Sequence, residues 1–343
     1  MRIRKNIIIN YFFLIVILLL IIFICIRLTI VNNKNKNENI TNDELNHLEP
    51  IKTIDMTKSF EFKRPDNGEL LTLSYSNSSI IEDPLNPNKY ILNSRCLTLL
   101  PSLLPYYLSI NKLTRLDHNF EIIESKLIDD NINQNSFAIG IEDIRLYVDN
   151  GEIYYSGSYF NGIVMKISNN KYIIEKEKLN LVPNLIHVEF NNYDNLTEKN
   201  WSYFDYKYEK HVIYQWFPLK ICKIIDNKLV LFESHIMPEY FSDFRGSSCG
   251  ITYKDNIWFI IHTKTGNGFI HHHFVCFDEN MNLIKYSKPY YFESDNVEYC
   301  TSFVINHNNI IIPYTVNDFA LKIGIYKLDY IFNELEYIDH KND

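Results

Sequence analysis

From about residue 57 to the C-terminus, short apolar and aromatic runs alternate with polar turns. The runs are rich in Ile, Val, Tyr and Phe, which favour the half-buried positions of β-strands. No stretch of this region shows the 3.6-residue repeat of an amphipathic helix. The pattern predicts an all-β region whose strands include residues 90–93, 143–148, 153–159, 162–168, 211–216, 229–232, 257–262, 274–278, 309–316 and 321–328.

Turns that contain Asn or Asp recur ahead of these strands. Asn150-Gly151 separates two runs, and because both residue types tolerate positive φ it predicts a β-hairpin. Comparable turns occur at Asn88, Asn227, Asn256 and Asn309, at irregular spacings broadly typical of propeller blades of ~40–50 residues. We predict a five-bladed β-propeller over residues 57–343, with two stacked β-sandwich domains as the alternative.

The N-terminus carries an apolar run over residues 7–26, interrupted only by Asn10 and Tyr11. Twenty helical residues at ~1.5 Å each span ~30 Å, the thickness of a bilayer's hydrocarbon core. No small-residue cleavage site follows the run, which favours an uncleaved transmembrane signal anchor over a secretory peptide. Residues 1–6 are predicted to be a cytoplasmic tail, and the polar residues 27–56 a stalk.

The basic residues Arg2, Arg4 and Lys5 precede the apolar run, which favours a cytoplasmic N-terminus. The chain is therefore predicted to be a single-pass type II membrane protein whose C-terminal domain is lumenal or external. Four Asn-x-Ser/Thr sequons are compatible with a glycoprotein on that side of the membrane: Asn39, Asn77, Asn195 and Asn200.

Charge and motif content exclude several classes of function. With 34 basic and 42 acidic residues the formal net charge is −8, so a nucleic-acid partner is not expected. The six cysteines are dispersed and form no Cys-x-x-Cys pair. The run His271-His272-His273 alternates between strand faces, so no metal site is predicted there.

The arginines are candidates for a binding or catalytic site, because only five of them follow residue 27 in a chain that otherwise uses Lys for its positive charges. A guanidinium offers a planar fork for carboxylates, phosphates or paired hydroxyls. In a propeller, polar residues at strand starts converge on one mouth of the central channel. The candidates at such positions are Arg95, Glu142, Asp143, Arg145, Glu198, Lys199, Asp243, Arg245, Glu298 and Asp318.

The run from Gly140 to Arg145, Gly-Ile-Glu-Asp-Ile-Arg, resembles the Glu-Asp-Pro-Arg motif of glycoside hydrolase family 130. That family contains β-mannoside phosphorylases and β-1,2-mannosidases on a five-bladed propeller. Similar relatives occur beside or fused to glycosyltransferases, including some in giant viruses, which implies a glycosyltransferase partner. Further similar stretches follow in family order at residues 197–201, 214–219, 244–248, 272–275, 298–300 and 314–318.

The resemblance implies an inverting cleavage of a β-mannoside glycan or oligosaccharide. Asp143 matches the acid, and Arg95 and Asp318 match residues that hold sugar hydroxyls, while Glu142 and Arg145 flank the acid and order it. In a regular strand Asp143 and Arg145 share one face and Glu142 points away. An adjacent arginine keeps a carboxylate ionised, so a sugar-hydroxyl relay or desolvation is needed for proton donation.

Hydrolysis requires a second carboxylate ~6.5–9.5 Å from the acid, for which Glu298 and Glu198 are the candidates. Phosphorolysis requires inorganic phosphate as co-substrate and a cationic cluster instead, which Arg245, Lys199 and His272 could form. Trp201 is a candidate for stacking on a sugar ring.

Two features leave non-enzymatic functions open. Ile144 stands where the motif has Pro, and Cys249 follows Arg-Gly-Ser-Ser in place of the expected small or Pro residue. The alternatives to an enzyme are a non-catalytic glycan-binding or glycosyltransferase-associated module, and a structural, possibly viral, membrane glycoprotein.

Overall fold

The computed structural model describes residues 45–64, 67–98, 107–128, 138–160, 165–171, 187–188, 197–294 and 296–340. These residues are almost entirely β-strand, as predicted; the exceptions are the 3-10 turn η4 (Glu239–Asp243) and the single π-helical turn η5 (Tyr330–Glu334). No helix within them is long and apolar enough to cross a membrane. The predicted cytoplasmic tail and anchor, residues 1–26, lie outside the described residues.

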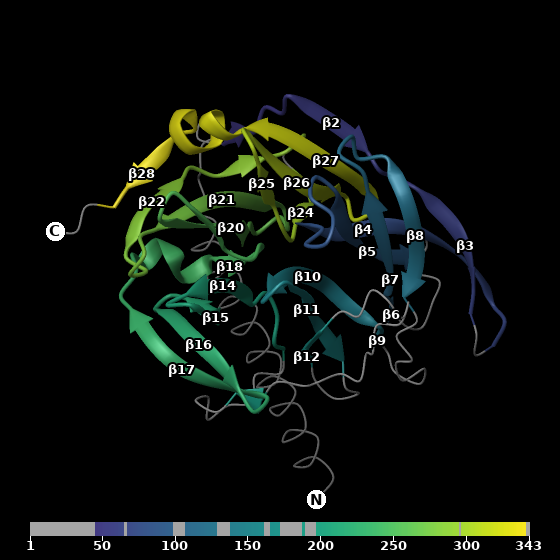
Figure 1. Cartoon of the computed structure of the whole chain (residues 1–343), viewed down its shortest axis with the longest axis horizontal. Coiled ribbons are helices and arrows are strands. Elements are labelled where there is room, and N and C mark those ends of the chain that lie inside the picture. The colour runs from purple at the N-terminus through teal and green to yellow at the C-terminus, as the bar shows by residue number, and fades with distance from the viewer. Residues whose placement is uncertain are drawn as a thin grey trace, which may run out of the picture.

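Among the described residues, five sheets of mainly antiparallel strands follow one another along the chain (Figure 1). The first contains β3 (Ser59–Lys63), β4 (Leu70–Glu82), β5 (Tyr90–Thr98), β7 (Ile110–Leu116) and β8 (Ile122–Ile128), and the second β10 (Ile141–Asp149), β11 (Glu152–Phe160) and β12 (Met165–Lys171). The third contains β13 (His187–Val188), β14 (Ser202–Tyr206), β15 (Glu209–Trp216), β16 (Leu219–Ile225) and β17 (Lys228–His235).

The fourth and fifth sheets complete the architecture. The fourth contains β18 (Arg245–Gly246), β19 (Ile251–Tyr253), β20 (Asn256–Lys264), β21 (Ile270–Phe277), β22 (Leu283–Ser287) and β23 (Tyr290–Tyr291). The fifth contains β24 (Glu298–Cys300), β25 (Val304–Asn306), β26 (Asn309–Val316) and β27 (Ala320–Lys327). A separate parallel pair joins β6 (Tyr107–Leu108) to β9 (Ala138–Ile139).

Apolar packing between the sheets closes them into a ring. Each of five buried clusters lies between two successive sheets, the last between the fifth sheet and the first. Because every sheet is covered on both faces, apolar side chains occur at successive strand positions rather than strictly alternating ones. Representative pairs in these clusters are Ile91 and Leu146, Tyr147 and Tyr203, Ile213 and Phe259, Phe274 and Ile312, and Leu321 and Leu73.

Strands near both ends of the described chain pair with strands of the ring. The N-terminal strand β2 (Lys52–Asp55) pairs with β27, and β1 (Asn46–His47) pairs with β23. The C-terminal strand β28 (Tyr337–Asp339) pairs with β22. Two strands within the predicted stalk, residues 46–47 and 52–55, therefore pair with two of the sheets.

The predicted hairpin at Asn150-Gly151 is present. Asp149 pairs with Glu152, and the two turn residues have φ of 50° and 76°, which matches the tight turn expected between twisted strands.

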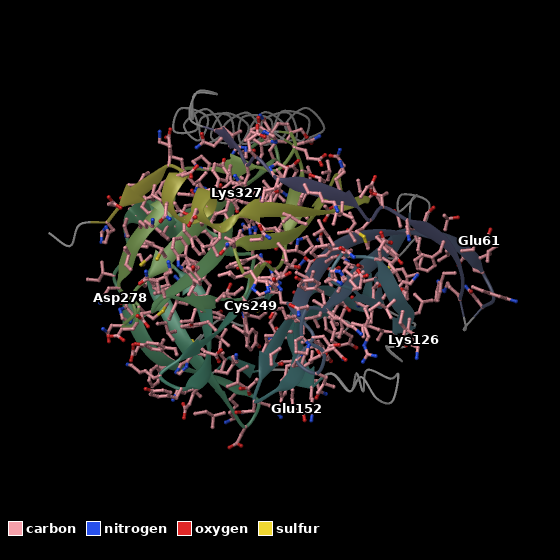
Figure 2. All side chains as sticks on the ribbon, turned by 45° about the horizontal axis from the view of Figure 1, so that its top comes forward. Glu61, Lys126, Glu152, Cys249, Asp278 and Lys327 are labelled. Carbon is pink, nitrogen blue, oxygen red and sulfur yellow. The ribbon has the colours of Figure 1, made fainter. Side chains whose placement is uncertain are left out.

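Figure 2 shows charged side chains such as Glu61 and Lys126 toward the outside of the molecule, whereas Cys249 lies toward its middle. The polar groups that face inward therefore need a separate explanation.

Hydroxyl side chains link neighbouring sheets at the centre of the ring. The Ser302 Oγ of the fifth sheet accepts from the Ile80 amide of the first at 2.7 Å. The Ser79 Oγ of the first sheet accepts from the Leu146 amide of the second at 2.8 Å. Short hydroxyls thus satisfy backbone N–H groups where no further strand can pair.

Candidate functional site

Polar groups from all five sheets, or from residues just before one of their strands, form one hydrogen-bonded cluster. Hydrogen bonds join them across the sheet boundaries, so residues far apart in sequence form one connected cluster. Its members are Asn77 from β4, Asp143 and Arg145 from β10, Asn200 before β14, Gly246 from β18 and Tyr299 from β24.

A β-bulge places the two adjacent acids on one side of β10. The register shifts between Glu142 and Arg145, and Asp143 has φ of 50°. Opposite the bulge, any Cβ on Gly157 would lie 2.9 Å from the Glu142 carbonyl oxygen. The expectation from regular strand alternation is therefore wrong here: Glu142 and Asp143 both contact Arg95, at 3.2 and 2.9 Å.

Asp143 is held through one carboxylate oxygen. Its Oδ1 accepts from Asn77 Nδ2 and from Arg95 Nη1, each at 2.9 Å, and no described residue donates to Oδ2. Burial alone would raise the pKa of Asp143, but the charge of Arg95 and the Asn77 hydrogen bond hold it below its ordinary value. The second oxygen of an ionised carboxylate thus remains available to a ligand.

Arg95 is used by the protein itself. Its Nε donates to Ser109 Oγ at 2.9 Å, while its two terminal nitrogens contact Asp143 and Glu142. Lys199 Nζ lies 3.3 Å from the other oxygen of Glu142. The predicted sugar-binding arginine therefore orders the acidic pair, and Glu142 is neutralised by two cations.

Arg145 connects four of the sheets. It is 3% exposed and donates to the carbonyl oxygens of Asp143 at 3.1 Å, Gly246 at 3.2 Å and Ser247 at 2.7 Å. Its Nη2 also reaches Asn200 Oδ1 at 3.1 Å and the Tyr299 hydroxyl at 3.0 Å. The predicted substrate-binding role is replaced by a positioning role, because these contacts occupy all three guanidinium nitrogens.

Asp318 lies at the rim, in a turn where both Asn317 and Asp318 have positive φ. Its side chain is solvent-accessible, yet partial burial raises its pKa, and the nearby charge of Arg95 opposes the shift while that of Asp143 adds to it. Asp143 and Asp318 therefore share one electrostatic environment and have pKa values pushed in opposite directions, a pattern found where carboxylates take distinct roles.

Glu298 supports a loop instead of facing Asp143. Its carboxylate accepts from the backbone amides of Phe292 at 2.6 Å and of Glu293 and Ser294 at 3.0 Å. The next residue, Tyr299, points toward Arg145, so Glu298 points to the opposite face of β24. The geometry does not bring this predicted water-activating residue into the cluster.

Replacing Glu298 with Gln should lower the free energy of unfolding by about 1–3 kcal/mol, because the new amide cannot accept all three backbone N–H groups. The kcat of the folded protein should change less than about tenfold, whereas losing a general base typically costs about 10²–10⁴-fold. Urea denaturation and initial-rate kinetics measure both, with the exposed Glu152→Gln as control. A hundredfold loss of kcat at unchanged stability would instead identify Glu298 as a catalytic residue.

Two other predicted groups are enclosed by protein. Trp201 is 2% exposed, and its Nε1 donates to Glu198 Oε2 at 3.2 Å, so it cannot stack on a sugar. Tyr214 donates to the other oxygen of Glu198 at 3.3 Å. The ring nitrogens of His272 have no partner among the described residues, and burial lowers its pKa well below the ordinary value, so it is a neutral buried side chain.

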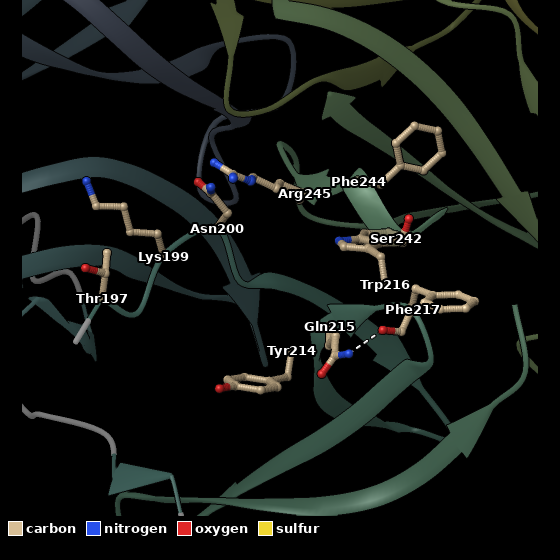
Figure 3. A pocket seen from close by; sticks show the side chains of 11 residues that line it. Thr197, Lys199, Asn200, Tyr214, Gln215, Trp216, Phe217, Ser242, Phe244 and Arg245 are labelled. Atoms are coloured by element: carbon tan, nitrogen blue, oxygen red, sulfur yellow. Dashed lines mark hydrogen bonds between the residues drawn. The ribbon is translucent and has the colours of Figure 1, made fainter. Parts of the chain in front are cut away.

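Arg245 and Lys199 line a pocket of about 400 Å³ beside the cluster (Figure 3). The described lining contains no carboxylate, so donors and positive charge dominate it. We call it the anion pocket; it is lined by Thr197, Lys199, Asn200, Tyr214, Gln215, Trp216, Phe217, Ser242, Phe244, Arg245 and Gly246.

Sequence reasoning missed three members of the cluster. Asn77 and Asn200 had been interpreted as sequons, and Tyr299 as part of a family-like stretch with no role. Asn77 lies at a bulge of β4 as Asp143 lies at a bulge of β10, whereas Asn200 precedes β14 and Tyr299 lies on β24. No shared strand position in the sequence marks all three. Among the described residues, no three His, Cys, Asp or Glu side chains gather as metal ligands would.

No protein-family model and no curated protein sequence matches the chain. Solved structures, in contrast, do match the chain. The chain is similar to a glycosyl hydrolase from Bacteroides ovatus, with 12% identity, a TM-score of 0.60 and coverage of 82% of this chain and 91% of that one. The fold is therefore that of a class of glycosyl hydrolases.

Two further solved structures with a similar fold are described as phosphorylases. A β-1,2-mannobiose phosphorylase from Listeria innocua has 12% identity, a TM-score of 0.56, and coverage of 80% and 95%. A mannose phosphorylase from Leishmania mexicana, in complex with phosphate ion, has 9% identity, a TM-score of 0.50, and coverage of 85% and 92%. The resemblance to the fold of glycoside hydrolase family 130 is thus confirmed.

Proposed function

We propose that the ring is a five-bladed β-propeller that cleaves β-mannosides or related glycans at the Asp143 cluster. The observation that carries this proposal is the ionised Asp143 carboxylate, fixed through one oxygen by Asn77 and Arg95 with its other oxygen open, beside the anion pocket. A carboxylate held this rigidly can orient a sugar hydroxyl without reorganising. The rim residue Asp318 would hold a second hydroxyl.

Phosphorolysis fits the surrounding charges better than hydrolysis does. The described glutamates that could activate water are engaged: Glu142 contacts Arg95 and Lys199, Glu298 holds its loop, and Glu198 holds Trp201. Asp318 is assigned to a sugar hydroxyl. The anion pocket instead presents Arg245 and Lys199, and its described lining contains no carboxylate, although Lys199 also contacts Glu142 from outside the lining. Inorganic phosphate is therefore the proposed co-substrate.

In the proposed reaction a phosphate oxygen attacks the anomeric carbon as the bond to the glycosidic oxygen breaks. The leaving oxygen takes a proton that Asp143 delivers directly or through a sugar hydroxyl, and a β-glycoside yields an α-sugar phosphate and a shortened glycan. Bound substrate displaces water from Asp143 and raises its pKa, so the carboxylate takes up one proton from solvent as the substrate binds, passes it to the leaving oxygen during cleavage, and ends ionised again.

A panel of β-mannosides incubated with the protein tests the proposal. We expect release of mannose 1-phosphate that requires inorganic phosphate, because Glu142, Glu198 and Glu298 are engaged by protein groups and Asp318 is assigned to a sugar hydroxyl. Phosphorus-31 NMR identifies the sugar phosphate, and the anomeric coupling reports its configuration. Free mannose released at the same rate without phosphate would establish hydrolysis instead, and binding without turnover would support the glycan-binding alternative.

The location of the protein is a second part of the proposal. The apolar residues 7–26 anchor the chain in a membrane with the ring on the lumenal or external side, where a glycosyltransferase and its glycan product are the proposed partners. The length and uniform hydrophobicity of the run support this placement.

A further inference from the structure

Two buried histidines lie directly opposite each other in the fourth sheet. His262 on β20 and His272 on β21 are cross-strand partners with ring centroids 6.3 Å apart, and they are 5% and 0% exposed. Both rings face the fifth sheet, where they lie 5.0 and 6.3 Å from the Tyr299 ring on β24 (Figure 1). The pair therefore packs against a residue whose hydroxyl joins Arg145 to Asn200 in the cluster.

The surroundings of His272 give a charged ring no support. Tyr290 and Phe292 also contact this ring, at centroid distances of 5.9 and 5.0 Å, and neither ring nitrogen has a hydrogen-bond partner among the described residues. A phenylalanine would fill the same apolar cage without burying an unpaired N–H group. What the imidazole adds is the capacity to take up a proton, although burial lowers its pKa well below the ordinary value.

His262 lies closer to charged groups, but no described carboxylate forms an ion pair with its ring. Its Nδ1 is 2.8 Å from Ser247 Oγ. Burial and the charges of Arg145 and Arg245 lower its pKa to about 3, and the charge of Asp143 opposes them. The titratable and charged groups around the pair are Asp143 and Arg145 from β10, Arg245 from β18, His271 and His273 from β21, Tyr290 from β23 and Tyr299 from β24.

The paired histidines make the packed state sensitive to acid. A histidine released to solvent takes up a proton near pH 6.5, whereas the buried rings remain neutral at lower pH. Stability is therefore complete above about pH 6.5 and is lost progressively as the pH falls toward the lowered pKa values. At pH 5 each histidine raises the equilibrium constant for opening by about 30-fold, and the pair by about 10³-fold. Two charged rings opposite each other also repel across the strands.

We infer that the pair of His262 and His272 is an acid-sensitive switch at the boundary between the fourth and fifth sheets. Neutral rings keep β24 packed against β21, and protonation separates the two strands and releases Tyr299 from Arg145. Because Arg145 also holds the carbonyl oxygen of Asp143, the cluster comes apart in the same step. The opening breaks no covalent bond, so it reverses at neutral pH, and it needs no substrate, so it is independent of the proposed function.

Urea denaturation of the full chain between pH 7.5 and 5.0 measures the effect. The unfolding equilibrium constant of wild type should rise as the pH falls, and in His272→Phe this rise should be smaller by about 30-fold, because one buried group no longer titrates. His118→Gln, which replaces an exposed histidine, is the control and should follow wild type. His272→Leu gives the same comparison where the larger ring does not fit the cage. Variants whose pH profile coincides with that of wild type overturn the inference.

Hydrogen exchange followed by mass spectrometry locates the opening. After correction for the intrinsic pH dependence of exchange, peptides from β21 and β24 should lose about tenfold more protection at pH 5 than peptides from β5 and β7, and should regain it at pH 7.5. His272→Phe should keep β24 protected at pH 5. Equal loss of protection in all five sheets, or loss that persists at pH 7.5, would show general acid denaturation and overturn the switch.

Discussion

Asp143→Asn is expected to lower kcat/KM for β-mannoside cleavage by about 10²–10⁴-fold, the contribution of a positioned proton-transfer group. The substitution keeps the size of the side chain and an oxygen for Asn77 and Arg95, so the cluster should remain assembled. What it removes is the titratable oxygen that no described residue occupies. Initial rates at saturating phosphate, together with a thermal melt, separate lost chemistry from lost folding.

Asp149→Asn is the matched control, because Asp149 is the last residue of the same strand, β10, away from the cluster. This variant should keep wild-type rates. Equal activity of Asp143→Asn and wild type on every cleaved substrate would remove Asp143 from the mechanism and, with it, the main argument for an enzyme at this end of the ring.

Arg145→Lys is expected to lower the free energy of unfolding by about 2 to 5 kcal/mol, the largest stability loss that we predict. Lysine keeps the charge but has three donors on one nitrogen, so at least two of the five acceptors around Arg145 lose their partner. Since these acceptors belong to four sheets, the loss loosens the ring as a whole. Urea denaturation followed by tryptophan fluorescence measures the change.

Arg115→Lys provides the comparison. Arg115 lies on β7 with a side chain 30% exposed, and its Nη1 forms an ion pair with Glu124 Oε2 at 3.5 Å. An exposed pair of this kind contributes about 0–1 kcal/mol, so its variant should unfold almost as wild type does. If the two variants had equal stability, the positioning role assigned to Arg145 would be untenable.

Periodicity was sufficient to predict the strands and the all-β class. Runs such as 257–262 and 309–316 fall within β20 and β26 because apolar, β-branched and aromatic residues need cover on both faces of a sheet. The Asn150-Gly151 turn was predictable for a local reason, the tolerance of these residues for positive φ. Local physical preferences therefore determined most of what the sequence revealed about the fold.

The site depended on geometry that strand patterns do not encode. The bulge at Asp143 turns Glu142 to the same arginine, although regular alternation separates the two residues. Glu298 was a candidate for the carboxylate that activates water, but the loop from Phe292 to Ser294 folds back and uses its carboxylate. A strand bulge and a loop conformation, neither of which the apolar pattern encodes, therefore decided both roles.

The amide of Asn77 has a consequence for how the protein matures. Its nitrogen donates to Asp143 and its oxygen accepts from Thr315, and the side chain is 7% exposed, although Asn77-Ser78-Ser79 is a glycosylation acceptor sequence. An oligosaccharide attached to this nitrogen during synthesis would leave no room for the first sheet to dock against the second. In a compartment that glycosylates nascent chains, β4 and β10 must pack together before the oligosaccharide is transferred to Asn77. The yield of correctly folded protein would then depend on the ratio of the folding rate to the glycosylation rate.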